Sequence, residues 1–154
     1  MADRAHRPGG LAAAESPDRR LRIATYGPRP DGGWDGCETI NVYGFTGIPH
    51  PDVLTDNADR ALRDLDAVGI FTHAPPTPPR PGLAAARSKG RLTIAGRPVW
   101  ARFSTYLAGS DEPNGGRLVQ HILYIDAHRL VEVAGTVREL TDAVPAVFWD
   151  SVQE

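Results

Sequence analysis

The sequence has a single cysteine, Cys37, among 154 residues, so an internal disulfide is excluded and no oxidising compartment is indicated. No stretch approaches the roughly 18 consecutive apolar residues that a membrane-spanning helix needs. The first residues also lack the apolar segment of a secretory signal peptide. From these absences we expect a cytoplasmic protein without a membrane span.

An excess of charge of one sign is lacking as well. The 17 basic and 19 acidic residues give a formal net charge of −2, which provides no overall attraction to nucleic acid. The histidines lack the spacing of metal ligands, and the glycine-rich segments lack the Lys-Ser/Thr of a phosphate-binding loop. We therefore expect no nucleic-acid partner, no metal and no cofactor.

Glycine and proline, by contrast, are abundant, with 16 and 14 residues, and they mark loops. Residues 1–20 are rich in Ala, Gly, Pro, Asp and Arg, which predicts a disordered tail in front of a single domain over residues 21–154. Five prolines between positions 75 and 81 predict a long extended linker over residues 72–90. We interpret this linker as a spacer, with a recognition strip as the alternative.

Apolar periodicity predicts the regular elements. Alternating and β-branched segments predict strands over residues 21–26, 38–45, 91–95, 99–107, 117–125 and 130–134. Leu54, Leu62 and Leu65 fall on one stripe of a predicted helix over 54–68, and a last helix is predicted over 142–152. Pro145 is compatible with that last helix because it would lie near the first turn. Tight turns between strands imply antiparallel pairing, so the predicted fold is α+β, an antiparallel sheet sandwiched between helices.

Three segments in this order resemble one known family. They are the run from Asn41 to Phe45 with the helix after it, the joint Ile94-Ala95-Gly96-Arg97-Pro98-Val99, and the C-terminal segment with Pro145, Val147 and Phe148. Over roughly residues 38–153 the chain is similar to the LpqN-type lipoproteins of actinobacteria, which have a PsbP-like α/β/α sandwich. The resemblance implies a non-enzymatic module that binds lipid-like molecules or protein partners, as chaperones and assembly factors of this fold do.

One strand face carries the candidate binding residues. Trp100, Arg102 and Tyr106 share a face of the predicted strand 99–107, and Trp34 precedes them in a glycine-rich loop. His121 is in phase with apolar neighbours, so it packs in the core or lines a cavity. We hypothesise that these residues bind an apolar ligand or a partner protein, since aromatic and arginine side chains are typical of both kinds of site. The alternative is that this face packs under a helix.

Two further classes of function stay open. Cys37 with a histidine would make a nucleophilic pair for a small hydrolase or transferase, although no local motif supports it. An inhibitor or immunity-type protein would need only a complementary surface. Because no catalytic constellation is complete, the sequence favours a non-catalytic binding protein, with Cys37 as a structural thiol.

Overall fold

A six-stranded antiparallel sheet forms the centre of the molecule in a computed structural model that describes residues 19–26 and 35–152. The strand order is β1-β2-β6-β5-β4-β3. In chain order the elements are β1 (Arg19–Tyr26), β2 (Gly36–Phe45), α1 (Pro51–Asn57), α2 (Arg60–Asp64), β3 (Val68–His73), β4 (Leu83–Ile94), β5 (Arg97–Ala108), β6 (Gly116–Asp126), the short 3-10 turn η2 (Ala127–Arg129) and α3 (Leu130–Ser151). Residues 1–18, most of the predicted tail, and Trp34 lie outside the described residues.

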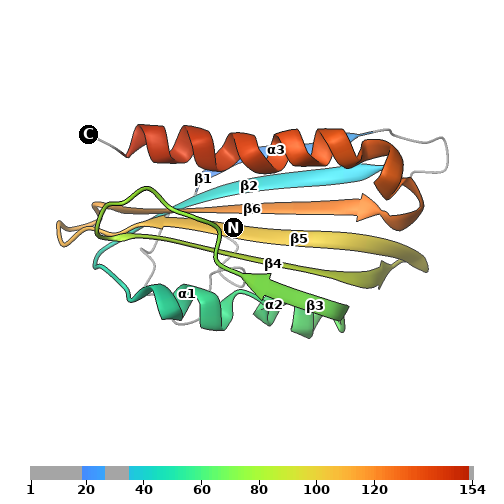
Figure 1. The fold of residues 1–154 in the computed structure, drawn as a ribbon, viewed down its shortest axis with the longest axis horizontal. Helices are drawn as coiled ribbons and strands as arrows, with labels where there is room; N and C mark the ends of the chain where they lie inside the picture. Colours follow the sequence, from blue (N-terminus) through green and yellow to red (C-terminus); the bar gives the residue numbers. More distant parts are fainter. Residues whose placement is uncertain (1–18, 27–34, 153–154) are drawn as a thin grey trace.

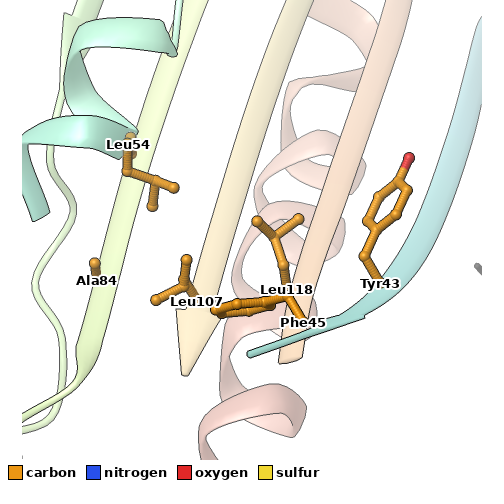
Figure 2. Close-up of a cluster of buried hydrophobic side chains, with 7 residues drawn as sticks. Tyr43, Phe45, Leu54, Ala84, Leu107 and Leu118 are labelled. Carbon is orange, nitrogen blue, oxygen red and sulfur yellow. The ribbon is translucent and has the colours of Figure 1, made fainter. Parts of the chain in front are cut away.

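Helices lie on both sides of the sheet. Figure 1 shows α3 on one side and α1 with α2 on the other. On the α1 side, Leu54 packs with Phe45, Leu107 and Leu118. Figure 2 shows this cluster, with Leu54 of α1 reaching toward the sheet. On the α3 side, Phe148 packs against Tyr106 and Val119. The predicted α+β sandwich, an antiparallel sheet between helices, is confirmed.

The joint from Ile94 to Val99 that was noted in the sequence is the turn of the β4–β5 hairpin. Its two turn residues, Ala95 and Gly96, both have positive φ angles, of 51° and 79°. Two-residue hairpin turns with positive φ at both positions match the right-handed twist of the strands they join, and glycine accommodates this conformation readily. The tight turn sets β4 and β5 in register from Ile94↔Arg97 to Leu83↔Ala108.

The predicted linker over residues 72–90 is wrong in extent. Only residues 74–82 connect two strands, because Val68–His73 is β3 and the chain re-enters the sheet at Leu83. Ala84, Ala85 and Ala86 are buried one after another, since β4 lies inside the sheet and both of its faces are covered there. A run of alanines shows no period-2 pattern and has little β propensity, so only tertiary packing reveals this strand.

The predicted strand 130–134 is also wrong, because these residues begin α3. The apolar residues that α3 turns toward the sheet recur at helical spacing: Leu130, Val133, Val137, Leu140, Val144 and Phe148. Pro145 therefore lies deep within a 22-residue helix rather than near its first turn. Without an N–H, Pro145 cannot donate to the carbonyl of Thr141, and packing against the sheet compensates for that lost bond.

The predicted helix 54–68 is two short helices. The chain leaves helical geometry at Asp59, with φ −100° and ψ 4°, and α2 is followed by Asp66 in the left-handed region at φ 59°. Leu54 and Leu62 are buried as predicted, whereas Leu65 is 46% exposed. The breaks at both ends of α2 turn Leu65 away from the sheet, so its predicted core position is wrong.

Candidate functional site

The predicted binding residues of β5 do share one face, the side that faces α3. Trp100 packs near Leu130 and Val133 of α3, and Nη1 of Arg102 donates to Oγ1 of Thr141 over 3.3 Å. Tyr106 stands edge-on to Trp149 with ring centroids 5.9 Å apart. The period-2 pattern of the sequence therefore gave the correct face for all three side chains.

Burial separates these three residues into two groups. Tyr106 is 1% exposed and belongs to the core beneath α3, whereas Trp100 and Arg102 are half-buried at its margin. The Tyr106 hydroxyl accepts from Nη2 of Arg87 over 2.6 Å. Tyr106 thus orients Arg87 through its buried hydroxyl, while Trp100 and Arg102 are partly exposed at the surface.

His121 lies deeper still. Its Nε2 is 2.6 Å from Oε2 of Glu38, and both residues are 1% exposed. Ser104 is the strand partner of His121 and is 0% exposed. A serine beside a histidine beside a carboxylate has the composition of a catalytic triad, but burial keeps all three from contact with a substrate. His121 and Glu38 form an internal polar pair of the α3-side core.

The histidine and Cys37 lie on opposite sides of the sheet. Cys37 pairs with Tyr124, whose side chain packs with the α2-side core, whereas His121 packs under α3. Burial raises the pKa of the Cys37 thiol, and the neighbouring negative charge of Glu38 raises it further. Both effects disfavour the thiolate that a nucleophile needs.

We therefore expect Cys37→Ser to leave ligand binding unchanged, because His121 lies on the opposite face of the sheet and burial disfavours the thiolate. Labelling of Cys37 with a thiol-selective reagent is expected to be slow at pH 7 and to accelerate only above the ordinary cysteine pKa. Rapid labelling at pH 6 would contradict this assignment.

Beyond the margin of α3, the side chains of the same sheet face are half-buried or exposed. This part of the face carries Phe71 and His73 from β3, Arg87, Lys89 and Arg91 from β4, and Trp100 and Arg102 from β5. We call these seven residues the open basic face. The strand register places Phe71 beside Lys89, Lys89 beside Arg102, and Arg91 beside Trp100. Phe71 is 55% exposed although it is apolar.

Each aromatic ring of this face lies close to a cation. The Lys89 ammonium is 5.6 Å from the centroid of Phe71, and the Arg102 guanidinium is 4.9 Å from that of Trp100. Within the described residues, Arg87, Lys89, Arg91 and Arg102 form no ion pair with any carboxylate. The face therefore combines apolar surface with positive charge that no ion pair neutralises among the described residues, in a chain whose formal net charge is −2.

Burial, and after it the neighbouring cations, shifts the pKa values of two groups on this face. Burial lowers the pKa of His73, and the charges of Arg87, Arg102 and Lys89 lower it further. Burial also lowers the pKa of Arg102, as does the charge of Arg87, while Tyr106 and Asp142 act in the opposite direction. Nε of Arg102 is buried and has no hydrogen-bond acceptor in the part of the chain that the structure describes.

Sequence reasoning missed five of these seven residues, because residues 72–90 were assigned to a linker, β3 was not predicted, and the predicted strand began only at Arg91. The signal was present in the segment Arg87-Ser88-Lys89-Gly90-Arg91-Leu92, where basic residues alternate strictly with small or apolar ones. That alternation is typical of a strand with one face in the core and the other in solvent.

Comparison with solved structures finds a protein with a similar fold. A crystal structure of LpqN from Mycobacterium tuberculosis superposes with a TM-score of 0.55 at 15% sequence identity, over 79% of this chain and 73% of that one. The chain has the LpqN fold. That fold agrees with the family resemblance found in the sequence. No family model matches the sequence, and no curated protein matches it significantly.

LpqN is described as involved in cell envelope biogenesis. At this level of identity, the likeness of our chain to LpqN concerns the fold alone, and function is carried by sites placed on a fold. Within the described residues, no helix is both long and apolar enough to cross a membrane. Nor do those residues gather three or more His, Cys, Asp or Glu side chains in a metal-binding arrangement.

Proposed function

We propose that this chain is a non-catalytic binding protein and that its open basic face binds a molecule with an apolar body. The observation that carries this proposal is the exposed ring of Phe71 on β3 together with the half-buried ring of Trp100 on β5, on the same face of the sheet with β4 between them. Aromatic rings with a few polar groups are the usual lining of sites for small apolar ligands. The LpqN fold, in a protein described as involved in envelope biogenesis, supports a ligand of lipid-like character.

Phe71 is the best residue for testing this proposal, because its exposed ring contributes little to the core. We expect Phe71→Ser to weaken the binding of monomeric decyl sulfate at least about tenfold, measured by isothermal titration, while the melting temperature changes little. Val147→Ser is the matched control, since Val147 is 69% exposed on α3, away from the face. Equal affinities in the two variants would contradict the proposal.

Trp100 and Arg102 extend the same test toward α3. We expect Trp100→Ala and Arg102→Ala to reduce affinity more than they reduce thermal stability, because both residues are only half-buried. A collapse of stability in both variants would show that these side chains belong to the core. Native mass spectrometry of the freshly purified protein then identifies any ligand that co-purifies.

One observation favours a second candidate function, the binding of a partner protein. β3 forms one edge of the sheet, and no described strand pairs with its outer side. Val68 and Phe71 of this edge are 67% and 55% exposed. An apolar, uncharged edge strand is suited to the addition of a strand from a partner. Co-purification of a protein rather than a small molecule would favour this function, which includes an inhibitor or immunity-type role.

The cellular location of the chain stays a prediction. A cytoplasmic location was expected from the sequence, whereas LpqN is described as involved in cell envelope biogenesis. Fractionation of cells that express the native gene would decide between the cytoplasm and the envelope.

A further inference from the structure

The open basic face carries more positive charge than a molecule with only an apolar body would need. Arg87, Lys89 and Arg91 alternate along β4, and Arg102 is the strand partner of Lys89 on β5. Alternate residues of a strand point to the same side, so these four cations stand within one small area of the sheet. Like charges at such positions destabilise a sheet unless something compensates them.

Among the described residues, no carboxylate forms an ion pair with these cations, although the charge of Asp142 acts on Arg102. Arg87 is held by neutral oxygens: its Nε donates to Oγ of Ser104 over 3.0 Å, and its Nη2 donates to the Tyr106 hydroxyl. Arg102 is held the same way by Thr141. The guanidinium groups are therefore oriented without being neutralised.

Arg102 contributes a half-buried guanidinium to this area. Its Nε is buried and has no acceptor among the described residues, so an anion would meet the other N–H groups of this guanidinium. The Arg102 guanidinium lies over the ring of Trp100, 4.9 Å from its centroid. Lys89 is its partner on the neighbouring strand. A planar guanidinium beside an ammonium is a common arrangement for binding the oxygens of a phosphate group.

We propose that the ligand of the open basic face is a single amphiphile with a phosphate-type head, held by Arg87, Lys89 and Arg102, and with its apolar chain over Phe71 and Trp100. This inference rests on the proposed function and names the chemistry of its ligand. A head with two negative charges offsets the repulsion among the three cations more fully than a carboxylate would, and a neutral sugar head would offset none of it.

The test compares three probes of the same protein by isothermal titration. Decyl phosphate carries both parts of the proposed ligand, decyl maltoside has a neutral head on the same chain, and inorganic phosphate is the head alone. We expect decyl phosphate to bind at least about tenfold more tightly than either of the other two, with its backbone chemical-shift changes centred on β3 to β5. Equal affinity for decyl maltoside would overturn the inference while leaving the proposed function intact.

Two variants remove charge from the site. Lys89→Gln and Arg102→Gln are each expected to reduce the preference for decyl phosphate over decyl maltoside several-fold, and Lys89→Gln does so without disturbing a hydrogen bond to α3. Arg60→Gln is the matched control, because Arg60 is exposed on α2 at the other side of the sheet. A preference that survives both Lys89→Gln and Arg102→Gln, or that falls equally in Arg60→Gln, would overturn the inference.

The remaining outcomes separate this inference from the proposed function. If no decyl amphiphile binds, whatever its head, the proposed function itself fails. If inorganic phosphate binds as tightly as decyl phosphate, the site recognises a free anion, and the apolar part of the proposal fails.

Discussion

Truncation of Leu62 to alanine is expected to lower the free energy of unfolding by about 2–5 kcal/mol, the usual cost of a cavity at a buried leucine. Leu62 is 0% exposed and packs on Leu92, Ala101 and Phe103, so it joins α2 to the sheet. Without that contact the five residues of α2 are expected to lose helical structure, because short helices are unstable alone in water. Urea denaturation followed by circular dichroism measures the change.

Leu65→Ala is the matched control, because it removes the same atoms three residues later. Leu65 is 46% exposed, so its truncation should cost far less than that of Leu62. Similar losses of stability in the two variants would show that the break at α2 is absent in solution and that one continuous helix presents both leucines to the core.

A second large effect is expected at the buried pair of Glu38 and His121. Glu38→Ala and His121→Ala should each destabilise the protein by about 3–5 kcal/mol if the pair is charged, and by less if it is neutral, because each leaves a buried polar group without this partner. The two atoms are 2.6 Å apart, so we expect a coupling energy of about 2 kcal/mol in a double-mutant cycle.

The ion pair of Arg63 with Asp59 provides the comparison for this cycle. It also joins two side chains by a short contact, but Arg63 is exposed to solvent. Water and salt screen such a pair, so its coupling energy should be far smaller. Additive effects of Glu38→Ala and His121→Ala would mean that the short contact between β2 and β6 does not persist in solution.

The sequence by itself determined the elements whose pattern is local. Alternation in residues 99–107 and 117–125 located β5 and β6 and the shared face of Trp100, Arg102 and Tyr106. The break between the predicted strands 91–95 and 99–107 located the hairpin of β4 and β5, and the apolar stripe through Leu54 and Leu62 located the helical layer opposite α3. In each case the residue period matches the geometry of the element, so that the chain carries the information within a few residues.

Only the tertiary structure decided the elements whose local residue preference differs from the secondary structure that they adopt. β4 begins with a run of alanines and is a strand because strands on both sides pair with it. Leu130 to Ala134 is rich in β-branched residues and is helical because α3 lies across the sheet and buries one of its faces. The extent of α3 also decided the candidate site, since its margin separates buried Tyr106 and His121 from the open cations of β4. Contacts with distant parts of the chain outweigh local propensity in these elements. The sequence of one segment does not show which distant residues will pack against it.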